Sequence, residues 1–320
     1  MSLGEFDLIA KYFTRTVTRA ALGVGDDCAL FAPSPGLQLA VSSDMLVEGR
    51  HFLSTVAPDR LGHKALAVNL SDLAACGAKP VAFTLALALP RVDERFLEGF
   101  ARGLLALADA HGCELIGGDT TQGPLNICIA VFGEVPQGQA LLRSGAQPGD
   151  DLYVSGTLGD ARLALEAFRG TVALGGDAFE RVRGAMERPQ PRVALGLALR
   201  GVATSAIDVS DGLLGDLAHV LRRSAVGAEI DVDTLPRSAV LRDLPIALQR
   251  ECTLAGGDDY ELVFTASPSA AVAVATAARQ AQLPVTRIGR ILHATGGLRL
   301  VDTHGRAIEN GYGSFDHFKA

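Results

Sequence analysis

Short segments that place aspartate beside glycine, serine or a second acid recur along the chain. They are Gly25-Asp26-Asp27, Ser42-Ser43-Asp44, Ser71-Asp72, Gly117-Gly118-Asp119, Asp208-Val209-Ser210-Asp211-Gly212, Gly256-Gly257-Asp258-Asp259 and Gly313-Ser314-Phe315-Asp316. Mg²⁺ prefers oxygen ligands and is usually held by a few carboxylates together with substrate phosphates. Asp and Gly are also ordinary turn residues, so one such segment is weak evidence. Together the segments predict a Mg²⁺-dependent phosphate site.

Four of these segments directly follow apolar runs that indicate strands. The runs are residues 37–41, 114–116, 206–207 and 252–255. Open α/β sheets bind ligands outside the carboxyl ends of their strands. The positions of the aspartates therefore agree with the metal and phosphate chemistry that their type suggests.

Composition sets the class of protein that must position these residues. The chain has 320 residues, of which 48% are hydrophobic and 20% charged, which is typical of a globular protein with two domains. Its formal net charge of -7 and the lack of a basic run argue against a nucleic-acid partner. An acidic protein that binds anionic phosphates needs metal ions to reverse the local charge.

Cysteine usage and the N-terminus favour a cytoplasmic location. The 5 cysteines are widely spaced and form no C-x-x-C pair, so we expect buried free thiols in a reducing compartment. The first residues lack the basic start and apolar core of a secretory signal. No window reaches the roughly 18–20 apolar residues that span a bilayer, so no membrane partner is expected.

Hydrophobic periodicity predicts alternating strands and helices in both halves, which is the α/β class. In the first half we expect helices over 5–13, 60–78 and 94–111, strands over 28–31, 37–41, 81–89, 114–116 and 125–135, and a loop over 44–58. In the second half we expect strands over 151–155, 205–209, 229–232, 252–255, 262–265 and 287–291, with helices over 160–168, 179–186, 192–199, 213–223 and 269–281. The stretch 137–149 is rich in Gly and Pro and predicts a linker between domains 1–136 and 150–320.

Two polar side chains need a structural test. In helix 60–78 the leucines form one stripe, while Asn69 and Asp72 lie on another face. Asp72 therefore belongs either to a solvated face or to a site. His51 follows the Ser42-Ser43-Asp44 segment in the expected loop, where it faces either a ligand or solvent.

The common nucleotide and hydrolase motifs are absent. The sequence contains no G-x-x-x-x-G-K-[ST] phosphate loop, no H-R-D catalytic loop, no G-x-G-x-x-G after a strand and no G-x-S-x-G elbow. The 7 histidines include no H-x-x-x-H pair. These absences argue against the common kinase folds, serine hydrolases and zinc enzymes.

Taken in order, the segments resemble the thiamine-monophosphate kinase family, within the superfamily of aminoimidazole ribonucleotide synthetase. The resemblance covers nearly the whole chain. It is carried by residues 23–28 (GVGDDC), 43–52 (SDMLVEGRHF), 68–77 (VNLSDLAACG), 117–121 (GGDTT), 143–145 (RSG), 207–213 (IDVSDGL) and 256–261 (GGDDYE). A single Gly-Gly-Asp would be weak evidence, but the ordered set is specific.

This resemblance implies ATP-dependent phosphorylation of thiamine monophosphate to thiamine diphosphate, the last step of thiamine diphosphate biosynthesis. It implies direct in-line transfer, with several Mg²⁺ ions and no covalent nucleophile. The implied metal ligands are Asp27, Ser42, Ser43, Asp44, Asp72, Asp119, Asp208 and Asp211. The implied ATP contacts are Gly118, Asp119, Arg143 and Ser210, and the implied substrate contacts are His51, Asp258 and Phe315.

The same resemblance implies an aminoimidazole ribonucleotide synthetase-like α/β (α+β) fold of two domains. It also implies a homodimer in which the N-terminal sheets of two subunits pair. Two residues depart from the family pattern: Asp258 stands where a Glu is usual, and Phe315 where Tyr or Trp is usual. The metal set is unaffected by either change. Two alternatives stay open: a relative that uses ATP on another acceptor, and a protein that binds ATP·Mg without catalysis.

Overall fold

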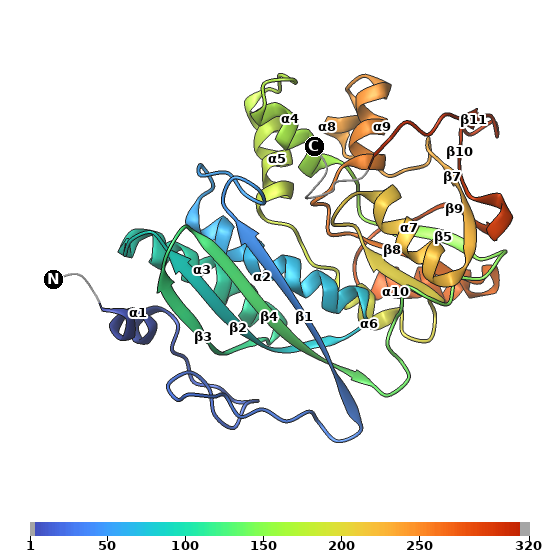
Figure 1. Ribbon diagram of the computed structural model, residues 1–320. Helices are drawn as coiled ribbons and strands as arrows, with labels where there is room; N and C mark the ends of the chain where they lie inside the picture. The colour runs from blue at the N-terminus through green and yellow to red at the C-terminus, as the bar shows by residue number, and fades with distance from the viewer. Residues whose placement is uncertain (1–3, 314–320) are drawn as a thin grey trace. The chain divides into compact units, whose positions relative to one another are not determined.

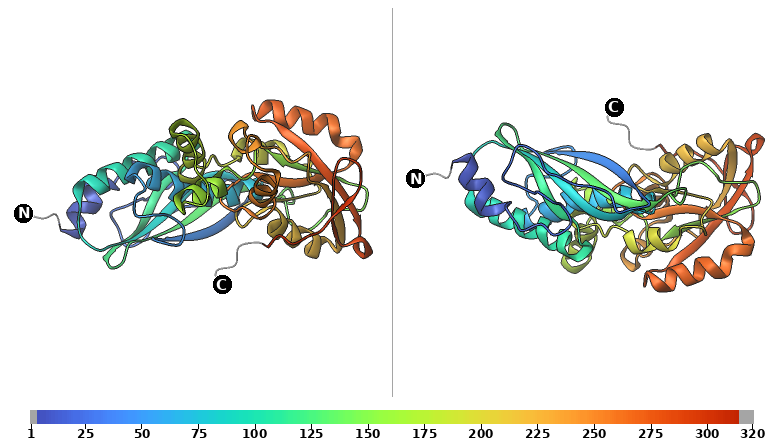
Figure 2. Two further views of the ribbon diagram at one scale, coloured as in Figure 1. Left: turned by 90° about the horizontal axis from the view of Figure 1, so that it is seen from above. Right: turned by 90° about the horizontal axis from the view of Figure 1, so that it is seen from below.

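The chain divides into two compact units, each built around one β-sheet (Figures 1 and 2). This computed structural model describes residues 4–313. The first unit contains Met1–Leu73 and Ala78–Gly138, and the second contains Ala74–Gly77 and Gln139–Ala320. Both units mix helices and strands, which confirms the α/β class expected from the sequence.

A 4-stranded sheet forms the centre of the first unit, with strand order β1-β4-β2-β3. Its strands are β1 (Leu37–Val47), β2 (Lys79–Leu89), β3 (Glu114–Gln122) and β4 (Asn126–Pro136), and its helices are α1 (Glu5–Tyr12), α2 (Pro58–Ala75) and α3 (Glu94–His111). β2 and β3 run parallel, whereas β4 is antiparallel to both β1 and β2. Strands β1 and β3 are therefore the two edges.

Helices α2 and α3 cover one face of this sheet (Figure 1). They approach closely because glycines stand at their crossing: a Cβ on Gly62 would lie 2.1 Å from the carbonyl oxygen of Phe100, and one on Gly103 1.8 Å from that of Asp59. Helix α3 has the bounds predicted from the sequence. Asp93 caps its first amides and Gly112, with φ of 59°, ends it.

Three local expectations for the first unit are wrong. Residues 28–31 form no strand and only an isolated bridge joins Leu22 to Leu30. Strand β1 continues to Val47, and β3 continues to Gln122, so Asp44 and Asp119 lie inside strands rather than in loops after them. Edge strands have one side open to solvent and therefore accept polar residues. A prediction from sequence ends the strand at such residues, whereas the structure continues through them.

The second unit contains a 7-stranded sheet in the order β11-β10-β7-β9-β5-β8-β6. Its strands are β5 (Asp151–Ser155), β6 (Ser205–Asp208), β7 (Val226–Asp231), β8 (Leu262–Ala266), β9 (Val285–His293), β10 (Leu298–Val301) and β11 (Ala307–Ile308). Its α-helices are α4 (Asp160–Phe168), α5 (Gly176–Glu187), α6 (Val193–Ala198), α7 (Leu213–Ser224), α8 (Ala239–Arg242), α9 (Ile246–Ala255) and α10 (Ala271–Gln280). Leucines of α7, among them Leu213 and Leu217, are buried in a cluster with Val154, Ile207 and Val263 of the sheet.

One further expectation is wrong in this unit, since residues 252–255 form the end of helix α9 rather than a strand. A short apolar run has the same appearance in a buried helix as in a buried strand. The cysteines only partly fit the expectation: all 5 in the sequence are free thiols, Cys113 and Cys252 are buried, and Cys28 is exposed. Across residues 4–313, no helix has the length and apolar character to cross a membrane.

Candidate active site

The polar residues of β1 contact α2 directly. The Ser42 hydroxyl donates a short hydrogen bond to the Asp72 carboxylate, and the Asp44 amide donates to Asn69 Oδ1 at 3.0 Å. Asn69 is 1% exposed and donates to the carbonyl oxygen of Ala65, so its side chain is fixed. Asp72 is half-buried and its carboxylate accepts from Ser42 on the edge strand β1. The structure thus brings Ser42, Asp44 and Asp72 into one neighbourhood.

Asp119 lies at the other edge of the same sheet. The strand register pairs Asp44 with Ile129, and Ile129 with Leu85. It then pairs Leu85 with Gly118, the residue before Asp119. Because neighbouring strands are about 4.8 Å apart, this row separates β1 from β3 by about 14 Å. Mg²⁺ ligands lie only about 2.1 Å from the ion, so this strand separation argues against one ion held by Asp44 and Asp119 of the same chain.

Gly118 has a structural reason to be glycine. Its φ is 150°, and an added Cβ would lie 1.9 Å from the carbonyl oxygen of Leu85 on β2. A side chain there would push β3 away from the sheet, and Asp119 with it. The close approach of Gly118 to β2 therefore holds the next residue, the exposed Asp119, on the edge strand β3.

Ser43 is exposed on β1, and the N-terminal turn and the loop after β1 carry Asp27 and His51. Asp27 is exposed, and its amide donates to Asp26 Oδ1 at 3.0 Å, which makes Asp26 a turn residue. His51 is half-buried and its Nδ1 accepts from the Val47 amide at 3.0 Å. Lys64 Nζ donates to the His51 carbonyl oxygen at 3.1 Å. The bond from β1 therefore orients the imidazole, and the bond from α2 holds the backbone of the loop.

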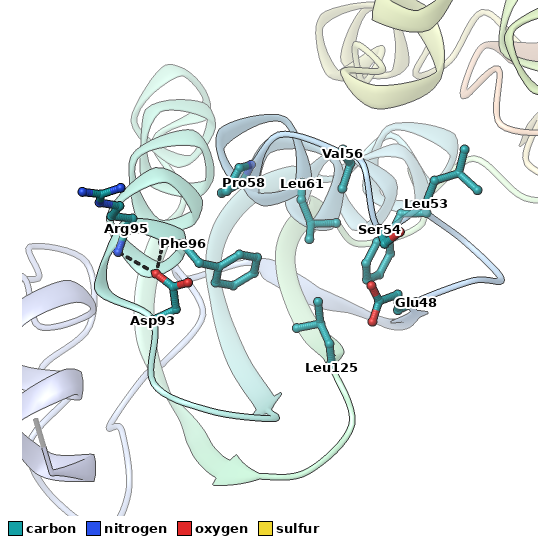
Figure 3. Close-up of a pocket in the computed structure, with 11 residues that line it drawn as sticks. Glu48, Leu53, Ser54, Val56, Pro58, Leu61, Asp93, Arg95, Phe96 and Leu125 are labelled. Atoms are coloured by element: carbon teal, nitrogen blue, oxygen red, sulfur yellow. Dashed lines mark hydrogen bonds between the residues drawn. The ribbon is translucent and has the colours of Figure 1, made fainter. Parts of the chain in front are cut away.

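A pocket of about 580 Å³ lies beside this loop in the first unit (Figure 3). Its wall contains Glu48, Phe52, Leu53, Ser54, Val56, Pro58, Leu61, Asp93, Arg95, Phe96 and Leu125. The Asp93 carboxylate is engaged in capping the amides of Arg95 and Phe96. The sequence-predicted site residues are not among these lining residues, although Glu48 and Phe52 belong to the 43–52 segment that carries the family resemblance.

In the second unit the predicted metal and ATP residues follow β6. Asp208 ends the strand and is 5% exposed, and Ser210 and Asp211 form the turn into α7. Both turn amides donate to one oxygen of Asp216, each at 3.0 Å. Burial, reinforced by the negative charge of Asp208, raises the pKa of Asp216 to about 8. Sequence reasoning missed Asp216, since an acid in the first helical turn is ordinary.

A second turn, residues 256–261, pairs with the first through its backbone. The Asp258 amide donates to the carbonyl oxygen of Ser210, and the Tyr260 amide to that of Val209, both at 2.8 Å. Asp258 and Tyr260 have positive φ values of 66° and 50°. The Tyr260 hydroxyl donates to Asp258 Oδ1 at 3.0 Å. Asp258, predicted on the substrate side, therefore lies one hydrogen bond from Ser210, predicted on the ATP side.

The other acids of this turn are structural. Asp259 is half-buried by accessible surface and accepts from the Gly159 amide, and desolvation of its carboxyl raises its pKa well above the usual range. Glu261 is 3% exposed and forms an ion pair with Arg192 as well as accepting from Ser155. The Gly-Gly-Asp-Asp-Tyr-Glu segment thus exposes Asp258 on a support made by its neighbours.

Arg143 is exposed, and its carbonyl oxygen accepts from Ser224 Oγ at the end of α7. The pKa of His219 on α7 is affected by the charge of Arg143. Burial lowers the pKa of His219, the charges of Arg222 and Arg143 lower it further, and Asp211 acts in the opposite direction. Arg143 and Asp211 therefore lie near the same helix. Phe315 lies outside the described residues.

The oxygen donors fit Mg²⁺. Carboxylates and a hydroxyl are hard ligands, and the repulsion that Asp208 and Asp211 exert on Asp216 is the negative charge that a divalent cation would offset. No group of three or more His, Cys, Asp or Glu side chains within residues 4–313 forms a complete metal site. A metal bound here would complete its coordination with phosphate oxygens and water.

Known proteins resemble the chain along nearly its whole length. The family model "AIR synthase related protein, N-terminal domain" matches residues 25–135, and the corresponding C-terminal domain matches residues 147–300. The thiamine-monophosphate kinase of Salmonella typhimurium is 45% identical over 99% of both chains. The crystal structure of the kinase of that name from Stenotrophomonas maltophilia is 46% identical, with a TM-score of 0.85 over 96% of this chain and 99% of that one.

A structure described as AaThiL complexed with AMPPCP and TMP is 29% identical, with a TM-score of 0.76 over 90% of this chain and 89% of that one. An identity of 45% over 99% of both chains confirms the resemblance to the thiamine-monophosphate kinase family that the sequence motifs indicated. The chain belongs to the thiamine-monophosphate kinase family, on the two-domain fold of the AIR synthase related proteins.

Proposed function

We propose that the chain transfers the terminal phosphoryl group of ATP directly to the phosphate of thiamine monophosphate. The bond between the β,γ-bridging oxygen and the γ-phosphorus breaks, a new phosphoanhydride bond forms to an acceptor phosphate oxygen, and ADP leaves. The product is thiamine diphosphate. Full-length similarity to thiamine-monophosphate kinases is the observation that carries this proposal. ATP as co-substrate is supported by the relative that holds an ATP analogue and TMP together.

Positioning and electrostatics account for the chemistry. The acceptor is already a phosphate anion, so no nucleophilic side chain or strong base is required. Mg²⁺ supplies the positive charge that brings two phosphates together. We assign Asp27, Ser42, Ser43, Asp44, Asp72, Asp119, Asp208 and Asp211 to Mg²⁺, and Gly118, Asp119, Arg143 and Ser210 to ATP. Arg143 suits this task because its planar donor fork matches phosphate oxygens.

The acceptor contacts are His51, Asp258 and Phe315 in this proposal. The hydrogen bond from Val47 to His51 Nδ1 and the one from Tyr260 to Asp258 hold two of them in fixed orientations. Asp258 also offers a carboxylate to the positively charged thiazolium ring of thiamine. A cytoplasmic location follows from the need for ATP.

We further propose that the active form is a homodimer whose subunits share the metal site. Asp44 and Asp119 lie on opposite edges of one sheet, so the Asp119 that meets Asp44 would belong to the second subunit. The free face of β1 supports such an association, since Leu39, Val41 and Met45 are 37%, 61% and 53% exposed on alternate residues. Alternate residues of a strand share a face, so these side chains form an apolar stripe.

The test is to incubate the purified protein with ATP, Mg²⁺ and thiamine monophosphate and to separate the products. We expect thiamine diphosphate and ADP in equal amounts. ADP release that needs a different acceptor would support the other-acceptor alternative. Nucleotide binding with no product from any phosphate monoester would support the non-catalytic one.

A further inference from the structure

We infer that Asp216, on the first turns of α7, is a positioning residue that sets the affinity of the chain for ATP·Mg without touching it. The inference rests on the proposed roles of Ser210 and Asp211. It goes beyond those roles because Asp216 is neither a proposed metal ligand nor a proposed substrate contact. Its evidence is the hydrogen bonding of the turn that joins β6 to α7.

The turn has no cap of the usual kind. Gly212 stands at the N-cap of α7 with φ of 110° and makes no side-chain hydrogen bond to the helix. In an ordinary cap the side chain before the helix accepts from amides inside it, whereas here Asp216 inside the helix accepts from amides before it. Its amide donates to the Gly212 carbonyl oxygen as a helical residue should, while its carboxylate reaches back to the amides of Ser210 and Asp211. One oxygen, Oδ2, accepts both bonds at 3.0 Å.

Because Asp216 is buried, removal of its carboxyl group would leave the two amides without a replacement acceptor from solvent. Asp216 is 4% exposed, between the buried Leu213 and Leu217. An amide that is buried without a hydrogen-bond acceptor is costly, and the loss of Asp216 would leave two such amides. Without the carboxylate, the two amides would have to turn toward water. Such a turn would move the Ser210 and Asp211 side chains from the places where they are proposed to meet ATP and Mg²⁺.

Ser210 is also held from the opposite side. Its carbonyl oxygen accepts from the Asp258 amide at 2.8 Å, and Val209 accepts from Tyr260. Those bonds do not involve Asp216, so the segment that carries Asp258 keeps its own support from Glu261 and Asp259 when Asp216 is changed. The expected defect is therefore selective: nucleotide and metal binding weaken, and acceptor binding changes little.

Asp302 provides a control, because it also accepts hydrogen bonds from two backbone amides, pairs in addition with Arg306, and is far in sequence from Ser210 and Asp211. Asp302 is 7% exposed, and its carboxylate accepts from the amides of His304 and Arg306, both at 2.9 Å. Replacement of either aspartate removes two bonds from backbone amides to a buried carboxylate. Only Asp216 holds residues assigned to ATP and Mg²⁺.

The experiment measures calorimetric binding of the analogue AMPPCP with Mg²⁺, in the absence of acceptor, to the full chain and to Asp216→Ala, Asp216→Asn and Asp302→Ala. We expect the Kd to rise about ten- to a hundredfold for Asp216→Ala. We expect a smaller rise for Asp216→Asn, which keeps an acceptor oxygen, and less than a twofold change for Asp302→Ala. The Mg²⁺ concentration for half-maximal binding should rise in the same order. Melting temperatures report the purely structural loss.

Two results would overturn the inference: Asp216→Ala that binds AMPPCP within twofold of the unmodified chain, or a loss that Asp302→Ala reproduces. If Asp216→Ala does not fold, Asp216→Ser takes its place under the same criteria, because its hydroxyl is too short to reach both amides. The measurement needs no turnover. Failure to make thiamine diphosphate would therefore count against the proposed function and leave this test intact.

Discussion

Two inactive variants should restore activity when they are combined in one dimer. Asp44→Asn removes a proposed metal ligand from the β1 edge, and Asp119→Asn removes one from the β3 edge. Each variant alone should lose at least about a thousandfold in kcat, since a charged group that holds a catalytic metal is lost in every site. In a mixed dimer with shared sites, one site carries both replacements and the other carries neither.

The expected recovery of activity follows from the strand register and from the symmetry of the dimer. The row from Asp44 through Ile129 and Leu85 to Gly118 spans about 14 Å, which argues against a shared ion within one chain. Random pairing of equal amounts gives about half mixed dimers, each with one of its two sites intact. The mixture should therefore regain about a quarter of the activity of the unmodified protein.

The assay is thiamine diphosphate formation after the two variants, carrying different affinity tags, are co-expressed and the mixed dimer is isolated through both tags. The isolated mixed dimer should have about half the activity of the unmodified dimer. A mixed dimer that is verified by mass spectrometry and remains inactive would refute the shared site. Substantial activity in Asp119→Asn alone would remove that residue from the metal set.

Three further predictions concern single positions. Asp72→Asn should raise the Mg²⁺ requirement more than tenfold while the melting temperature changes little, because Ser42 can still donate to the amide oxygen; an unchanged Mg²⁺ dependence in initial-rate assays would remove Asp72 from the metal site. Asp258→Glu should change KM for thiamine monophosphate more than KM for ATP and should destabilise the fold slightly, since φ of 66° suits Asp better than Glu; equal effects on both constants would place Asp258 elsewhere. Burial raises the folded-state pKa of Asp259, so its contribution to stability is complete below about pH 4 and is lost as the pH rises through the raised pKa. Asp259→Asn should flatten the dependence of urea-unfolding free energy on pH above about pH 4, and parallel pH profiles for the two proteins would contradict this assignment.

Local patterns predicted much of the secondary structure. Helix α3 has the bounds 94–111 predicted from its apolar periodicity, and the structure shows that Asp93 and Gly112 cap it from positions directly beside the helix. Strand β5 and helix α4 also have the predicted bounds. The failures occur where local and long-range forces compete. Residues 252–255 suit a strand as well as a helix, and their packing in the second unit decides for helix α9.

The sequence by itself determined which residues have chemistry to offer: aspartates and serines in ordered motifs, an arginine for phosphate, and a family that the comparisons confirm. Those motifs are short because each Mg²⁺ ligand needs only its own side chain and a permissive turn. Only the tertiary structure decided which of them meet. A hydrogen bond between β1 and α2 joins Ser42 and Asp72, and the strand order separates Asp44 from Asp119. The Asp216 carboxyl on α7 accepts from the amides of the turn before that helix. Strand order and burial depend on contacts between residues far apart in sequence, and no single segment carries that information.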